Sequence, residues 1–162
     1  SQPWRFKILT RAEDKAFLAG DASRQQQIFL AAGAVILCLA DLSAYRRDST
    51  AAYEGYAASG ALPEPMIKGI KDYVARELSG QLSSARAAGA MNVALAVSFM
   101  MLRATEMGLG TCWIGMFDEA NIKARLGLPA GWRVVNLLAA GRPDEPEVYP
   151  RKRKSLEDIV LF

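Results

Sequence analysis

The chain has 162 residues, and its 20 basic and 17 acidic side chains leave a net charge of only +3. Apolar residues make up 51% of it, which excludes a disordered chain and supports a single domain that buries about 70% of its unfolded surface. The sequence contains no histidine, which excludes a Ser-His-Asp or Cys-His mechanism and any zinc site with histidine ligands.

The first part of the chain predicts two strands with a helix between them. Residues 4–10 alternate apolar and polar side chains, as a strand does, and residues 11–30 predict a helix with a break near Gly20. The apolar positions of this helix are Ala12, Ala16, Phe17, Ile28 and Phe29. The apolar run 34–40 predicts a central strand covered on both faces. The polar, poorly periodic residues 41–63 predict a loop with a short helix.

Two further helices are predicted in the middle of the chain. Residues 65–79 place apolar side chains at helical spacing, and residues 84–107 form a long helix that is apolar nearly all round. Such a helix is enclosed by its own domain or shared with another subunit. Its charge-free run, 87–102, would rise about 24 Å, short of the roughly 30 Å core of a bilayer. We therefore expect a buried helix and no association with a membrane.

The last part of the chain adds two strands, at residues 111–115 and 133–140. The Pro-rich tail from residue 141 is expected to be extended until residues 156–160. Strands interleaved with helices predict an α/β or α+β architecture. The two cysteines, Cys38 and Cys112, form a poor disulfide framework, which indicates a reducing compartment and a cytoplasmic protein.

A helix is predicted between these last two strands. Asp118 is a good N-cap residue, and Glu119 suits the positive end of the helix dipole. Gly127 and Pro129 end the helix. The two adjacent carboxylates are therefore interpreted as capping residues rather than as an acid–base pair.

The segment GLGTCWIG at residues 108–115 is the strongest candidate for a ligand site. Gly108, Gly110 and Gly115 remove side chains that would keep a flat ligand away from the backbone. Spacing alone favours an ordinary core strand in which Trp113 is a packing residue. Cys112 lies in this apolar strand, which should raise the pKa of its thiol and leave it unreactive.

Three segments resemble the FMN-dependent nitroreductase family. GLGTCWIG is followed by FD and LGLP, the chain opens with SQPWRF, and it closes with GRPDEPEVYPRKRKSLEDIV. The resemblance implies an α+β fold, with a mixed sheet flanked by helices, in one flavin-binding domain over residues 1–162. It also implies an intertwined homodimer with two flavin sites at the interface. The family's Arg-rich N-terminal segment is absent from this chain, which is either a fragment or has lost part of the cofactor site.

The resemblance also implies which residues hold FMN. Beside the flavin ring and its phosphate it places Ser1, Gln2, Gln25, Cys112, Trp113, Ile114, Gly115, Arg151 and Arg153. A backbone N–H of the 112–115 strand would stabilise the charge that develops on the reduced ring. Gln26 or Gln27 could take the place of Gln25 if the register shifts, and all three side chains could instead face solvent. No catalytic side chain and no metal site is expected.

The basic run 151–154 has other interpretations on its own, namely a solvated charge run, a localisation signal or a nucleic-acid patch. An arginine fork pairs bidentately with phosphate, and the run lies where the family binds the FMN phosphate. Lys152 should point away from that site. Nucleic-acid binding is not expected, because the basic residues neither spread over a face nor alternate with aromatic residues.

The function implied by the resemblance is hydride transfer from NADH or NADPH, through FMN, to a small acceptor such as a nitroaromatic or a quinone. The two half-reactions would follow a ping-pong order. The alternative is a non-catalytic flavin-binding or dimeric interaction protein with a degenerate site. A third possibility is another flavin chemistry within the family, such as reductive dehalogenation or flavin fragmentation.

Overall fold

The computed structural model describes the chain except for residues 1, 24–25, 80–81, 145–149, 151 and 161–162. Its strands form one sheet in the order β1-β2-β4-β3, and all three pairings are antiparallel. The strands are β1 (Trp4–Leu9), β2 (Ala34–Asp41), β3 (Gly110–Ile114) and β4 (Trp132–Gly141). Within the described residues, the sheet has no parallel pair of the kind that a mixed sheet contains.

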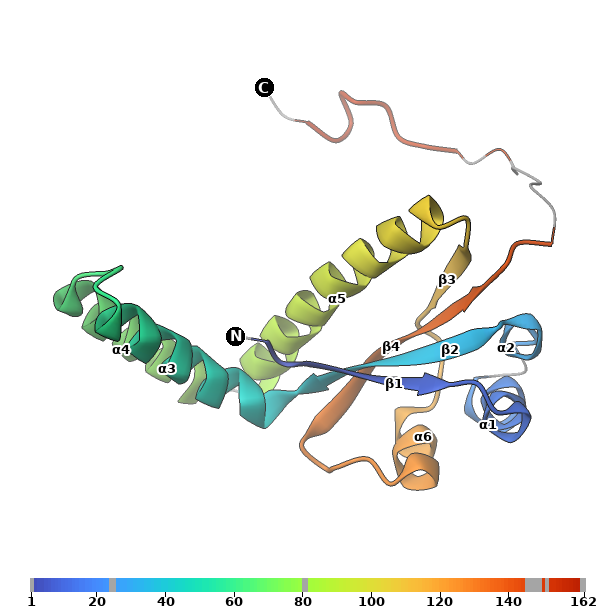
Figure 1. The fold of residues 1–162 in the computed structure, drawn as a ribbon, viewed down its shortest axis with the longest axis horizontal. Coiled ribbons are helices and arrows are strands. Elements are labelled where there is room, and N and C mark those ends of the chain that lie inside the picture. Colours follow the sequence, from blue (N-terminus) through green and yellow to red (C-terminus); the bar gives the residue numbers. More distant parts are fainter. Residues whose placement is uncertain (1, 24–25, 80–81, 145–149, 151, 161–162) are drawn as a thin grey trace.

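Helices cover both faces of this sheet. They are α1 (Ala12–Phe17), the π-helix η1 (Leu18–Ala22), α2 (Ile28–Ala31), α3 (Leu42–Ala58), α4 (Glu64–Ser79), α5 (Leu82–Glu106) and α6 (Glu119–Leu126). Figure 1 shows α5 along one face, α1, α2 and α6 at the other, and the α3–α4 hairpin reaching away from the sheet. This arrangement confirms the α+β class.

Strand β2 separates two hydrophobic cores. Val35, Leu37 and Leu39 point into the larger core with η1, α2 and α6, while Cys38 and Ala40 point into the smaller core beneath α5. The alternation follows from the two-residue period of a strand, which sends successive side chains to opposite faces. The prediction of a central strand covered on both faces is confirmed.

A β-bulge interrupts the pairing of β2 with β4 between Cys38 and Leu39. Asn136, the register partner of Cys38, is fully buried. Burial raises the pKa of the Cys38 thiol to about 12, against the smaller opposing effect of the Asn136 amide. Cys38 is therefore a packing residue, held as a neutral thiol.

The prediction of a loop with a short helix at residues 41–63 is wrong about the length of the helix, because α3 occupies 17 residues of this segment. Asp41 begins the helix: its carboxylate accepts hydrogen bonds from the backbone N–H groups of Ser43 and Ala44 at 3.1 and 3.0 Å. Most of α3 is exposed, so its sequence carries no apolar stripe. Asp41 was the sequence signal for the start of the helix. Without an apolar periodicity, the sequence did not indicate how long the helix is.

The helix expected over residues 11–30 is also divided differently. Ala12, Ala16 and Ile28 are exposed, whereas Leu18 and Phe29 are fully buried in the larger core. The turn of π-helix at residues 18–22 changes the angular position of the residues that follow it. Of the expected apolar positions, Phe29 is buried and Phe17 packs against the larger core, so the prediction is wrong only for Ala12, Ala16 and Ile28.

Helix α5 is not buried in its own chain, which corrects the expectation from its sequence. The segment Ala85–Glu106, with a mean hydropathy of 1.5, is long and apolar enough to cross a membrane by length and composition alone, yet only 17% of its most apolar part is buried. The core helix of a soluble protein passes the same test of composition. Most of the apolar stretch of α5 is therefore left uncovered by the part of the chain that the structure describes.

The cap at Asp41 makes folding stability depend on pH. Burial alone would raise the pKa of this carboxyl, but hydrogen bonds from Ala44 and Ser43 and the charge of Arg5 outweigh burial and hold the pKa below its ordinary value. A carboxylate of this kind stabilises the fold above its unfolded pKa, about 4, and the contribution is lost as pH falls through the lower folded pKa.

We expect Asp41→Ala to lower the free energy of unfolding by about 1 kcal/mol at neutral pH, the usual effect of losing an N-cap. Asp41→Asn keeps an acceptor oxygen and removes only the charge. Its deficit relative to the wild type, measured by urea unfolding, should narrow as the pH falls below about 4. A deficit that stays constant down to pH 2 would show that the charge contributes nothing.

Candidate functional site

Strand β3 lies at one edge of the sheet and pairs only with β4, from Gly110 opposite Gly141 to Ile114 opposite Leu137. Its other edge has no strand partner among the described residues. Unpaired N–H and C=O groups along such an edge are available to a ligand or another chain. The candidate segment is therefore a strand with one open side.

The three glycines of this segment have different roles. Gly108 has a φ of +73°, which ordinary residues rarely adopt, and forms the turn between α5 and β3. A Cβ on Gly110 would be in ordinary contact with the carbonyl oxygen of Gly141, at 3.7 Å. A Cβ on Gly115 would meet no atom within 4 Å. A Cβ on Gly108 would also meet no atom within 4 Å, but the positive φ of Gly108 already explains its glycine. Open space beside Gly115 therefore allows a ligand to approach the backbone at the end of β3.

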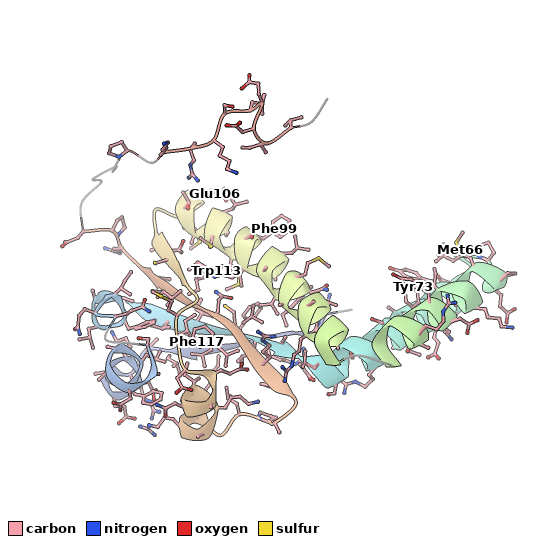
Figure 2. All side chains as sticks on the ribbon, turned by 180° about the vertical axis from the view of Figure 1, so that it is seen from behind. Met66, Tyr73, Phe99, Glu106, Trp113 and Phe117 are labelled. Atoms are coloured by element: carbon pink, nitrogen blue, oxygen red, sulfur yellow. The ribbon has the colours of Figure 1, made fainter. Side chains whose placement is uncertain are left out.

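The side chains of β3 alternate between the two faces of the sheet. Ile114 is buried in the larger core, and the half-buried Cys112 packs against that core. Trp113 points to the face of α5 and is 40% exposed. Figure 2 shows Trp113 on the same side as Phe99 of α5. A ligand at this strand could therefore contact Ile114 only through its backbone, whereas it could contact the exposed ring of Trp113.

The loop after β3 is fixed by hydrogen bonds to η1 and α6. The backbone N–H of Asp118 donates to the carbonyl oxygen of Ala22 at 2.7 Å, and its carboxylate accepts from the backbone N–H of Asn121 at 3.0 Å. Helix α6 ends at Gly127, which has a left-handed conformation with φ 60°. The predicted roles of Asp118 as N-cap and Gly127 as C-cap are confirmed.

Glu119 has a further contact that the sequence did not indicate. Its Oε1 atom accepts a hydrogen bond from the backbone N–H of Val134 at 2.9 Å. This contact covers part of the edge of β4 beyond the end of β3. Together with the cap at Asp118, it gives both carboxylates a structural partner.

An amide side chain reaches the candidate segment from the loop before α2. Nε2 of Gln26 donates a hydrogen bond to the carbonyl oxygen of Met116 at 2.9 Å. Gln25, the residue preferred by the resemblance, lies outside the described residues. Gln26 was one of the alternatives to Gln25. Its hydrogen bond to Met116 places it next to Gly115.

Of the other predicted site residues, the two that the structure describes, Gln2 and Arg153, are not brought to β3. Gln2 is exposed just before β1, which forms the opposite edge of the sheet from β3. Arg153 lies in the segment 152–160, which Figures 1 and 2 both show apart from β3. Ser1 and Arg151 lie outside the described residues. The described part of one chain thus assembles only the Cys112–Gly115 segment and Gln26.

An exposed apolar stripe runs along α5 beside this segment. It consists of Met91, Leu95, Phe99 and Leu102, each more than half exposed. The spacing of three or four residues places all four on one side of the helix. Trp113 of β3 is also partly exposed, and Figure 2 shows it on the same side of the sheet as Phe99. An exposed apolar surface of this kind marks a binding site or an interface between subunits.

Comparison with known proteins shows what this arrangement corresponds to. The nitroreductase family matches residues 1–142. A Thermus thermophilus protein named NADH dehydrogenase is 29% identical over 162 residues, 99% of this chain and 76% of its own length. The nitroreductase-type protein ydfN of Bacillus subtilis, a solved structure, is 24% identical with a TM-score of 0.84, covering 99% of this chain and 78% of that protein.

A second solved structure, of a nitroreductase-type protein from Exiguobacterium sibiricum in complex with FMN, is 23% identical with a TM-score of 0.78. The superposition covers 99% of this chain and 76% of the other. At these identities the two solved structures establish the fold, and the family match over most of the sequence establishes the relationship. This chain belongs to the nitroreductase family.

Proposed function

We propose that this protein is an FMN-dependent oxidoreductase that takes hydride from NADH or NADPH and passes it to a small acceptor of the nitroaromatic or quinone type. The observation that carries the proposal is the open backbone at Gly115, at the end of an edge strand and beside an exposed apolar surface. Family membership and the similarity to a protein named NADH dehydrogenase support the reaction class. The two half-reactions would share one face of the cofactor in ping-pong order.

The residues at this site suit a flat, partly polar cofactor. FMN supplies the hydride acceptor and donor, and the protein positions the ring and controls access to it. The backbone of Trp113, Ile114 and Gly115 would lie along the ring, with the unpaired groups of β3 available to its polar edge. Gln26, already bonded to the carbonyl oxygen of Met116, supplies an amide next to this position. Arg151 and Arg153 would bind the phosphate.

We further propose that the flavin site is completed by a second copy of this chain. Gln2 and β3 lie at opposite edges of the sheet, so one chain cannot place both beside the same ring. The apolar stripe of α5 supplies a surface for pairing two copies, and it adjoins Trp113. A homodimer with α5 at its centre would bury this stripe and bring Ser1 and Gln2 of the partner subunit toward β3.

The reaction class is tested by the visible spectrum of the purified protein after titration with FMN and then anaerobic NADH or NADPH. We expect stoichiometric uptake of FMN, loss of the oxidised flavin spectrum on addition of the nicotinamide, and its return with a quinone. Uptake without reduction would instead support a non-catalytic flavin-binding protein. No uptake would contradict the proposed cofactor.

The placement of the ring is tested by Gly115→Val. The added side chain would meet no atom of the chain at its Cβ, so the fold should keep its thermal midpoint. The same side chain would occupy the space proposed for the ring, so FMN uptake should be abolished. Gly131→Val is the matched control, because a Cβ at Gly131 also meets nothing within 4 Å. A Gly115→Val protein that keeps its flavin would show that the ring lies elsewhere.

The role of α5 is tested by Phe99→Glu in the middle of the stripe. A carboxylate there would be buried without a partner on association, which costs several kcal/mol, at least about 3. Sedimentation equilibrium should show a dimeric wild type and a monomeric variant. Leu30→Glu, at a half-exposed position of α2 on the opposite face of the sheet, should remain dimeric. A dimeric Phe99→Glu protein would exclude this surface as the interface.

A further inference from the structure

A second concave site lies where the beginnings of α3, α5 and β4 approach α6. It is a cavity of about 320 Å³, at the small end of the range of ligand pockets. Its charged lining residues are Arg86, Glu119, Lys123 and Arg133, and its apolar lining includes Leu42 and Trp132. None of these residues belongs to the proposed FMN site.

The cavity carries an excess of positive charge. Three cations face one carboxylate, and none of the three forms an ion pair among the described residues. Glu119 lines the cavity, and one of its oxygens is already engaged by the backbone N–H of Val134. The formal charge of the lining side chains is therefore +2, with part of the acceptor capacity of the carboxylate already used.

The three cations differ in what they can offer a ligand. Nζ of Lys123 donates to the carbonyl oxygens of Ala130 and Trp132 at 2.9 and 2.7 Å, which fixes its charge at the cavity wall. Arg86 and the half-buried Arg133 have no hydrogen-bond partner among the described residues. Each guanidinium has five N–H donors in a planar fork. Arg86 is exposed and Arg133 is half-buried, so both guanidinium groups are accessible to a ligand in the cavity.

We propose that this cavity binds the phosphate group of a small ligand, held by Arg86 and Arg133. Guanidinium forks pair bidentately with phosphate oxygens, and a dianionic phosphate would balance the charge of the cavity. The fixed ammonium of Lys123 adds to the field at the same place. Leu42 and Trp132 give an apolar wall to the rest of a phosphorylated molecule, such as the organic part of a nucleotide.

The site is tested by calorimetric titration of FMN-saturated protein, or of the protein as purified if it takes up no FMN, at constant ionic strength. The ligands are inorganic phosphate, AMP and adenosine. We expect saturable binding of one phosphate per chain, and no binding of adenosine. AMP binding more tightly than phosphate would identify a nucleotide as the source, and equal affinities would identify the phosphate group alone.

Arg133→Ala and Arg86→Ala should each weaken the binding of phosphate at least tenfold, and Arg133→Lys should be intermediate because it keeps the charge without the fork. Arg103→Ala, which removes an exposed arginine paired with Glu106 at the other end of α5, is the matched control and should bind normally. Phosphate should raise the thermal midpoint of the wild type and of Arg103→Ala, but not that of Arg133→Ala.

Absence of saturable binding to the wild type would overturn the proposal, as would equal affinities in the wild type and the two alanine variants. Either result would leave the proposed oxidoreductase function untouched, because FMN uptake and reduction are measured separately. Conversely, a protein that takes up no FMN can still bind phosphate in this cavity.

Discussion

The antiparallel pairing of β2 with β4 is the interaction on which the rest of the fold depends. It joins two segments that are far apart in the sequence and forms the middle of the sheet. Both hydrophobic cores are built against it, one with η1, α2 and α6 and the other with α5. Because this pair occupies the centre, β1 and β3 must lie at opposite edges, and the segments that precede or follow them are kept apart.

This separation determines what one chain can do alone. The edge strand β3 offers an open backbone and Gln26 beside it, but the N-terminal segment begins at the far edge and Arg153 lies away from the sheet. In the described part of one chain, the sheet topology alone keeps these segments apart. The exposed side of α5 also leaves an apolar surface next to the open strand, which a second copy of the chain could cover.

The elements that were predicted well are those in which the order of apolar and polar residues follows from which side chains are buried. Strands β1, β2 and β4 alternate or run apolar because they face a core on one or both sides. Asp118 and Gly127 were predicted because caps are local and depend on few residues. The length of α3 was underestimated because most of the helix is exposed, and only the cap at Asp41 indicated where it begins.

The candidate site was predicted in part for similar reasons. The glycine-rich strand is recognisable from its own few residues. The glutamine whose amide contacts it depends on the path of the loop before α2, and the sequence pattern does not predict that path. Among the described residues it is Gln26 that reaches Met116, and Gln25 lies outside them. The cavity with Arg86 and Arg133 was not predicted at all, because its residues come from elements that only the folded chain brings together.

The open face of α5 links folding to the amount of protein present. A helix with apolar side chains on two sides is stable only when both sides are covered, and here the sheet covers one of them. In the proposed dimer the other side is covered by mass action, so the apparent stability of the fold would increase with the logarithm of protein concentration. Dilution would then loosen the structure and release any ligand that spans the interface in the same step.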